Sequence, residues 1–150
     1  MKKFLCGLML LCSACAAFAQ KEDKAIKAVI NQFFEGMQQG DTALIRGACT
    51  AAPVLQSYMN NEKGELTVQT EDFEDFIRFV GTPTPNKYEE RIEFEAIHAE
   101  KSLASVWTPY TFWVNEKLSH CGTNSFQLVK TEAGWKIQYI IDTRRRQGCK

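Results

Sequence analysis

Residues 119–143 decide the fold; they read SHCGTNSFQLVKTEAGWKIQYIIDT. Polar and apolar residues alternate along the first half, a turn follows at Thr131 to Gly134, and a second alternating run begins at Trp135. This pattern predicts an antiparallel hairpin that closes a sheet. Counting back from a four-residue turn gives three cross-strand pairs, Lys130–Trp135, Leu128–Ile137 and Phe126–Tyr139.

The same register places polar groups and aromatic rings together on the inner face of the sheet. The residues that this predicts to line a pocket and bind a ligand are Tyr110, His120, Asn124, Tyr139 and Thr143, with Thr108 and Phe126 beside them. Aromatic surface for stacking and a few convergent polar groups suit a small planar molecule. The alternative is that Tyr110 and Tyr139 are core residues whose hydroxyls reach the pocket rim.

Residues 1–19 have the three parts of a secretory signal peptide. Two lysines precede an apolar run, and small residues end in Ala17-Phe18-Ala19. We expect cleavage before Gln20, leaving residues 20–150 as one domain that is secreted or periplasmic, with no transmembrane span because the apolar run is too short. The alternative is lipidation at Cys15.

The mature chain is predicted to begin with helices. Lys24 to Gln39 carries one apolar stripe at helical spacing, with Asp23 as its N-cap, and Gly40 ends it. Asp41 then caps a short second helix. Residues 54–59 and 65–69 predict a short hairpin, and a third helix with Thr70 as its N-cap stops at Gly81.

From Lys87 onward the period changes to two. Ile92, Phe94, Ala96 and His98 are predicted to share the inner face of a strand, and Glu90 has the same parity. In the next strand, Trp107 and Trp113 project from the outer face. An exposed aromatic patch marks an interaction site, so we expect a homodimer through these tryptophans; the alternative is that the chain's own termini cover them.

Helices followed by a long antiparallel sheet predict an α+β fold, with helices packed in the hollow of a curved sheet. The residues 105–112, SVWTPYTF, together with 122–126 and 134–137, resemble the nuclear transport factor 2-like superfamily, whose fold is a cone. Residues 120–126, HCGTNSF, and 141–145, IDTRR, resemble its small secreted lumazine-binding or polyketide-cyclase-like (SnoaL-like) branch. The resemblance implies a pocket inside the cone, while a fold alone does not fix function.

Three functions stay open. The first is a non-catalytic small-molecule-binding protein. The second is an isomerase-, cyclase- or hydrolase-like enzyme, as in ketosteroid isomerases of this superfamily, which use a carboxylate inside the cone; the candidates here are His120 and Glu90. The third is a structural dimerising module whose cone is filled by its own side chains.

The charge balance and the positions of the histidines and cysteines indicate which kinds of partner and ligand to expect. Basic and acidic residues number 18 each, so no nucleic-acid partner is expected. His98 and His120 are the only histidines, and no H-x-x-H or C-x-x-C spacing accompanies them, so we expect no metal and no cofactor. The run Arg144-Arg145-Arg146 could hold an anionic ligand group or remain solvated.

Secretion would leave Cys49, Cys121 and Cys149 in an oxidising compartment. The register puts Cys121 opposite Arg144, so only a chain reversal at Gln147-Gly148 could bring Cys149 within bridging distance. We hypothesise a Cys121–Cys149 disulfide that pins the tail across the pocket mouth, with Cys49 left as a buried thiol on the second helix.

Overall fold

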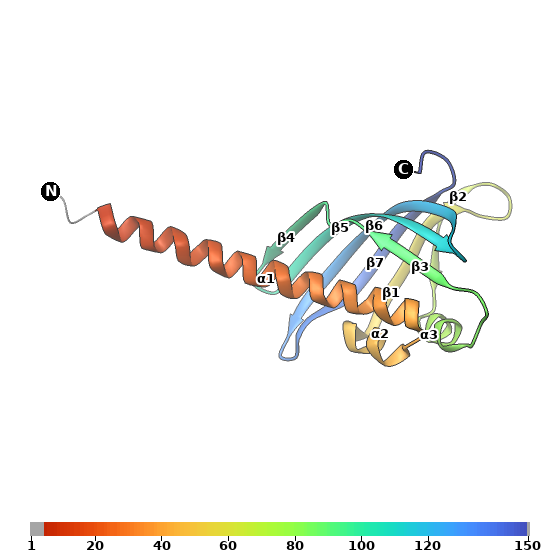
Figure 1. Ribbon diagram of the computed structural model, residues 1–150, viewed down its shortest axis with the longest axis horizontal. Helices are drawn as coiled ribbons and strands as arrows, with labels where there is room; N and C mark the ends of the chain where they lie inside the picture. The colour runs from red at the N-terminus through yellow and green to blue at the C-terminus, as the bar shows by residue number, and fades with distance from the viewer. Residues whose placement is uncertain (1–4, 150) are drawn as a thin grey trace.

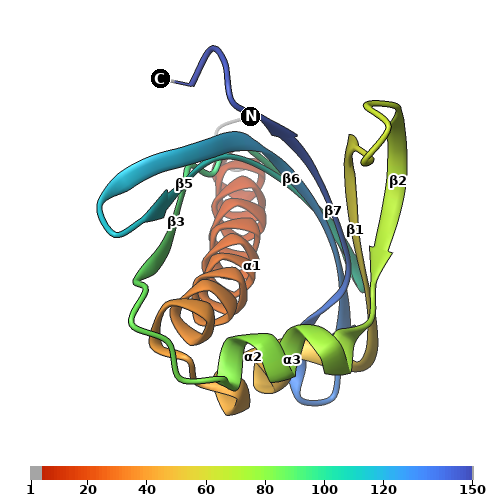
Figure 2. The same ribbon diagram turned by 90° about the vertical axis from the view of Figure 1, so that its right-hand side faces the viewer.

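A strongly curved, mostly antiparallel sheet wraps around one face of a long helix in the computed structural model (Figures 1 and 2). The structure describes residues 5–149, with side chains from Gln20 onward. The helices are α1 (Leu5–Gln39), α2 (Thr42–Ala48) and α3 (Phe73–Gly81). The strands are β1 (Cys49–Asn60), β2 (Leu66–Glu71), β3 (Tyr88–Ile92), β4 (Ala96–Glu100), β5 (Leu103–Val114), β6 (Lys117–Thr131) and β7 (Gly134–Arg145).

Within the described residues the strands form one seven-stranded sheet in the order β2-β1-β7-β6-β5-β3, with β4 also paired to β5. The pairing of β1 with β7 is parallel, and the other pairs are antiparallel. In Figure 2 the sheet curls over α1, while α2 and α3 lie across the open side below it. This confirms the predicted α+β fold with helices in the hollow of the sheet.

The core lies between α1 and the inner face of the sheet. Ile26, Ile30 and Phe33 present the apolar stripe of α1, and they pack with inward-facing residues of β5, β6 and β7 such as Val106, Phe126, Leu128 and Ile137. The inner face therefore follows the alternation expected of a half-buried sheet.

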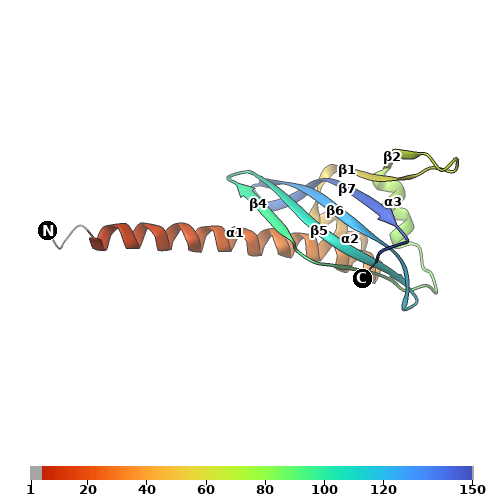
Figure 3. The same cartoon turned by 90° about the horizontal axis from the view of Figure 1, so that it is seen from above.

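The first helix is longer than predicted. It starts at Leu5 rather than Lys24, so Asp23 lies inside it and caps nothing. No proline interrupts residues 5–39, and the segment around Asp23 is rich in good helix formers. Its first turns project beyond the sheet (Figure 3). Residues 1–4 of the predicted signal peptide and the side chain of Cys15 lie outside the described part of the chain. Cleavage before Gln20 and lipidation at Cys15 both stay predictions.

Among residues 5–149, the helices include none that is long and apolar enough to cross a membrane.

Local capping signals fix the other helix ends. Gly40 has φ +70°, and the Asp41 carboxylate accepts from the amides of Ala43 and Leu44, as predicted. The third helix is capped by Asp72 rather than Thr70, because the Asp72 carboxylate accepts from the Glu74 and Asp75 amides while Thr70 is still in β2.

Two one-residue shifts alter which face of the sheet a side chain occupies. Between β6 and β7, Leu128 pairs with Ile137 as predicted. The next pair is Gln127 with Tyr139, so Gln138 is an extra residue in β7. The prediction that Phe126 pairs with Tyr139 was wrong; Phe126 pairs with Ile140.

The second shift lies between β3 and β4. Ile92 pairs with Tyr110, whereas Ala96 pairs with Trp107. The intervening segment faces Pro109, which has no amide hydrogen to offer the ladder. As a result Ile97 packs against the core and His98 is exposed, so the inner-face prediction for His98 was wrong.

Candidate functional site

A cavity of about 410 Å³ lies in the hollow between the sheet and the helices. Its apolar wall comes from α1, α3 and the sheet: Phe33, Phe34, Met37, Leu55, Phe76, Phe79, Tyr88, Phe112, Phe126 and Ile140. Its polar wall comes from the strands: Gln56, Ser57, Glu71, Glu90, Tyr110, His120, Asn124, Asp142 and Arg144. An apolar hollow with convergent polar groups is the usual form of a small-molecule site.

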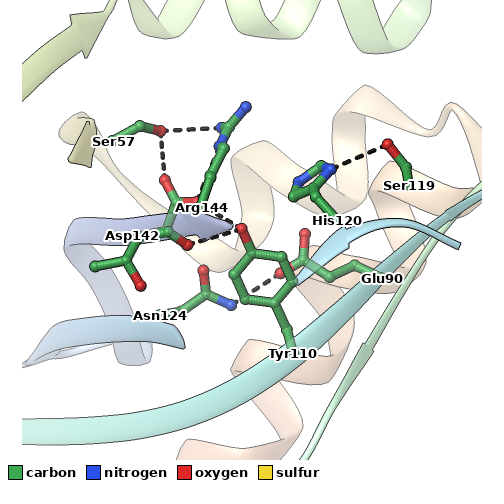
Figure 4. Close-up of polar contacts among 9 residues, drawn as sticks. Ser57, Glu90, Tyr110, Ser119, His120, Asn124, Asp142 and Arg144 are labelled. Carbon is green, nitrogen blue, oxygen red and sulfur yellow. Dashed lines mark hydrogen bonds and ion pairs between the residues drawn. The ribbon is translucent and has the colours of Figure 1, made fainter. Parts of the chain in front are cut away.

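Asp142 is the centre of one polar cluster, shown in Figure 4. Its Oδ2 accepts from the Tyr110 hydroxyl at 2.8 Å and from Arg144 Nε at 3.0 Å, and its Oδ1 accepts from the Ser57 hydroxyl. Arg144 Nη2 also donates to Ser57 Oγ at 2.9 Å. Because Asp142 is buried, these donors replace the water that the carboxylate would otherwise bind.

Gly122 makes room for this cluster. It pairs with Arg144 across the β6–β7 ladder and faces Tyr110 across the β5–β6 ladder. A Cβ at this position would come within 1.7 Å of the Thr143 carbonyl oxygen and 2.7 Å of Tyr110 Cε1. A side chain here would therefore collide with the Tyr110 ring and with the Thr143 backbone, so glycine keeps both in their present positions.

Glu90 and Asn124 form a second polar pair in the cavity. Asn124 Nδ2 donates to Glu90 Oε1 at 2.8 Å, from β6 to β3 (Figure 4). The pKa of Glu90 is raised to about 7, chiefly by burial and also by the negative charge of Asp142, while the Asn124 hydrogen bond and the charge of Arg144 act in the opposite direction. Near neutral pH this carboxyl group can therefore both bind and release a proton.

Aromatic rings form a continuous row beside Glu90. The ring centroids of Phe79 and Tyr88 are 6.0 Å apart, those of Tyr88 and Phe112 are 6.1 Å apart, and those of Phe112 and His120 are 4.8 Å apart and nearly parallel. The Tyr110 ring meets His120 edge-on at 5.8 Å. Such a row offers both stacking surface and negative ring faces to a ligand.

Burial also sets the protonation of the other two groups. It lowers the pKa of His120, and the positive charge of Arg144 lowers it further, so the imidazole is neutral at pH 7. The pKa of Tyr110 is raised by burial and by the negative charge of Asp142, which keeps its hydroxyl protonated.

The structure brings together four of the residues predicted for the site. Tyr110, His120, Asn124 and Glu90 all line the cavity. Tyr139 and Thr143 do not: the Tyr139 hydroxyl donates to Gln56 Oε1 at 2.8 Å, and Thr143 pairs with Thr123 on the outward parity of β6. The extra residue in β7 causes this difference, since a one-residue slip inverts the faces of a strand.

The same bulge brings in two residues that the sequence did not place in the site. Asp142 was not a candidate, and Arg144 was considered only as part of a basic run. One sequence signal could have pointed to them. Ile140 and Ile141 are adjacent and both apolar, so either one could face the core, and the alternation pattern does not decide which residues of the strand face inward.

The side chains of His98 and His120 lie apart, one exposed and one in the cavity. Among the described residues, no group of three His, Cys, Asp or Glu side chains is arranged to hold a metal ion.

Cys121 and Cys149 form the disulfide that was hypothesised, with Cα atoms 5.6 Å apart. Gly148 has φ +68°, which supplies the chain reversal. Cys121 lies on the face of β6 opposite to that of His120 and Asn124. Among the described residues, none beyond Arg144 lines the cavity. The tail therefore lies on the outer face, and its predicted position across the pocket mouth was wrong. Cys49 is a buried free thiol at the start of β1 rather than on α2.

Trp107 and Trp113 lie on the outer face of β5, as predicted. Trp107 is 48% exposed, and Trp113 is half-buried beneath the Arg91 guanidinium, 4.5 Å from its ring. Trp107 is thus not covered by the chain itself, and dimerisation through this face stays a prediction.

Residues 21–139 match the model of the family described as "Putative lumazine-binding". The chain belongs to this family. Its fold is that of the nuclear transport factor 2-like superfamily, as the resemblance implied.

Solved structures of low sequence identity share this fold. An NTF2-like protein of unknown function from Shewanella baltica is 17% identical, with a TM-score of 0.63 over 83% of this chain and 94% of that one. A conserved protein from Planctomyces limnophilus is 16% identical, with a TM-score of 0.69 over 84% and 98%. An NTF2-like protein of unknown function from Methylobacillus flagellatus is 16% identical, with a TM-score of 0.63 over 83% and 93%. No curated protein matches the chain.

Proposed function

We propose that this family member binds a small organic molecule with a planar, largely apolar body in the cavity between the sheet and α1. The observation that carries the proposal is the cavity of about 410 Å³, whose apolar aromatic wall faces a small set of polar groups. That volume suits a ligand of one to a few fused rings.

The lining suggests a role for each part of the cavity. Phe112 and Tyr88 offer ring faces for stacking, while Tyr110, His120 and Asn124 offer polar atoms that orient the ligand. The family description names lumazine binding, so planar heterocycles are the first ligands to test. The cavity argues against a purely structural module with a filled cone.

We also infer that the protein acts in an oxidising, extracytoplasmic compartment. The Cys121–Cys149 disulfide supports this, because such bridges persist outside the reducing cytosol.

Native mass spectrometry of the purified protein, followed by calorimetric titration with lumazine, riboflavin and other planar heterocycles, tests the function. A cavity variant, Asn124→Leu, should weaken binding at least tenfold, because it removes a buried polar group that fixes the ligand. The control Thr123→Val lies on the opposite face and should bind like the wild type. Absence of a co-purified molecule and of any binding below millimolar concentration would contradict the proposal.

A second candidate is an enzyme that transfers a proton within the same cavity. The pKa of Glu90, near 7, favours it, because a general acid or base works best when its pKa lies near the operating pH. His120 is the weaker candidate, since its pKa is lowered. If the ligand found by mass spectrometry is converted, Glu90→Gln should retain binding while losing turnover by a factor of a hundred or more. Unchanged turnover in this variant would exclude Glu90 as the acid or base.

A further inference from the structure

The cavity lining carries more carboxyl groups than cations. Among the residues that line it, the acids are Glu71, Glu90 and Asp142, and Arg144 is the one guanidinium or ammonium group. The helices contribute no charge to this lining: their residues are Phe33, Phe34, Met37, Phe76 and Phe79. His120 does not make up the difference, because burial and Arg144 lower its pKa.

Arg144 is already committed to Asp142. Its Nε lies 3.0 Å from Asp142 Oδ2, and its Nη2 donates to the Ser57 hydroxyl at 2.9 Å. The remaining two acids form no ion pair with a cation among residues 20–149: Glu90 accepts a hydrogen bond from the neutral amide of Asn124, and Arg144 acts on Glu90 and Glu71 only through its charge at longer range. Glu71 is exposed to solvent, so the cost of an unpaired charge falls on Glu90: a buried carboxylate without an ion-paired cation is costly unless a proton or a ligand neutralises it.

Glu90 is also the acid that lies among aromatic rings. Tyr88 precedes it by two residues on the same face of β3, and Phe112 is its direct partner across the β3–β5 ladder. Phe112 in turn stacks on His120, with 4.8 Å between centroids. A carboxylate beside ring faces is the environment that attracts an organic ammonium group, through an ion pair and cation–π contacts.

We propose that the molecule bound in this cavity carries a protonated amine, which pairs with the Glu90 carboxylate while its aromatic body lies against Tyr88 and Phe112. This inference rests on the proposed binding function and adds the charge of the ligand to it. The amine supplies the positive charge that the lining lacks, and Asn124 holds the carboxylate from its other side.

A neutral ligand with a carbonyl group would use Glu90 in the opposite protonation state, as a hydrogen-bond donor. The two alternatives differ in the sign of proton exchange. The groups around Glu90 are Glu71 of β2, Tyr110 of β5, His120 and Asn124 of β6, and Asp142 and Arg144 of β7. In the free protein, burial, the Asn124 hydrogen bond and the charges of Asp142 and Arg144 together leave the pKa of Glu90 at about 7, so the group is about half protonated at pH 7. A cation lowers that pKa and releases a proton, whereas a carbonyl acceptor raises it and takes one up.

The test compares three probes with one ring system: 2-naphthylmethylammonium, 2-naphthylmethanol and 2-naphthoate. Each is titrated into the wild-type protein at pH 7 in two buffers of different ionisation enthalpy, which gives the number of protons exchanged. We expect the ammonium probe to bind at least tenfold more tightly than either other probe and to release up to about half a proton.

Two matched variants locate the effect. Glu90→Gln should remove the preference for the ammonium probe and its proton release. Glu89→Gln should change neither, because Glu89 is paired with Arg91 on the outer face, at 2.8 Å. The proton release needs no variant, so it tests the inference even if Glu90→Gln fails to fold.

Equal or tighter binding of the alcohol or the carboxylate, or proton uptake on binding, would overturn the inference while leaving the binding function intact. Failure of all three probes would overturn the inference too. The binding function itself would then be decided by the separate heterocycle titration.

Discussion

The buried hydrogen bond between Tyr110 and Asp142 should be a measurable part of the protein's stability. We predict that Asp142→Ala lowers the free energy of unfolding by roughly 2–3 kcal/mol. The bond joins a buried hydroxyl to a carboxylate at 2.8 Å, and such bonds contribute about 1.5–3 kcal/mol. The Arg144 side chain is 41% exposed, so its ion pair adds only about 0–1 kcal/mol.

The loss stays moderate because Tyr110 keeps a second acceptor. Its hydroxyl lies 3.1 Å from the Thr143 carbonyl oxygen, so the variant does not leave a buried donor without a partner. Tyr110→Phe should cost less than Asp142→Ala, about 1–1.5 kcal/mol, because Asp142 then retains Ser57 and Arg144.

Urea denaturation of both single variants and the double variant gives the coupling between the two side chains. We expect a coupling of about 1 kcal/mol, which is no larger than the cost of Tyr110→Phe alone, because Tyr110 keeps the Thr143 carbonyl as an acceptor in the Asp142→Ala background. The control Glu132→Ala, an exposed acid in the β6–β7 turn, should change stability by less than about 0.5 kcal/mol. Additive single effects, or a loss below about 0.5 kcal/mol in Asp142→Ala, would refute the assignment of this cluster as a stabilising network.

Three further measurements test the remaining features. Cys149→Ser opens a loop between cysteines 28 positions apart and should cost about 3.5 kcal/mol on the chain-entropy estimate; unchanged urea stability under non-reducing conditions would contradict the bridge. Trp107→Glu should convert the predicted homodimer to a monomer in sedimentation, and a wild-type protein that is monomeric at high micromolar concentration would disprove that interface. The folded-state pKa of Glu90, raised from 4.5 to about 7, means that the folded protein holds this proton more tightly than the unfolded chain. Wild-type stability relative to Glu90→Gln should therefore be greatest below pH 4.5 and fall by on the order of 3 kcal/mol up to pH 7; a rise over that range would contradict the assignment.

The fold was predictable because its signals are local. The apolar stripe before Gly40, the Asp41 cap and the turn at Thr131 to Gly134 each act within a few residues. They gave the order of the elements and the correct first pairs of the hairpin. The cap of α3 was misjudged because Thr70 and Asp72 are both suitable caps two residues apart. The start of α1 was misjudged because no proline interrupts residues 5–39, so the helix continues on the N-terminal side of Lys24.

The site was only partly predictable because it depends on strand phase. Tyr110, His120 and Asn124 lie on strands whose phase the sequence gave correctly, and they line the cavity. Beyond Gln138, the face that each side chain of β7 occupies depends on a bulge, and tertiary packing decides whether that bulge forms. Sequence reasoning did not include the bulge, so it assigned Tyr139 to the face that Ile140 occupies. The environment of Glu90 needed the structure as well, since its raised pKa comes from burial and from Asp142, which is distant in sequence.

The extra residue in β7 also governs how sites can be compared between distant relatives. If a related chain lacks a residue matching Gln138, a gap-free count along β7 aligns its inward side chains with the outward ones of this chain. Asp142 and Arg144 would then be matched to surface positions, although equivalent groups could stand one residue earlier. Comparison of cavity chemistry across this fold therefore has to follow the side-chain direction of each strand rather than its residue count.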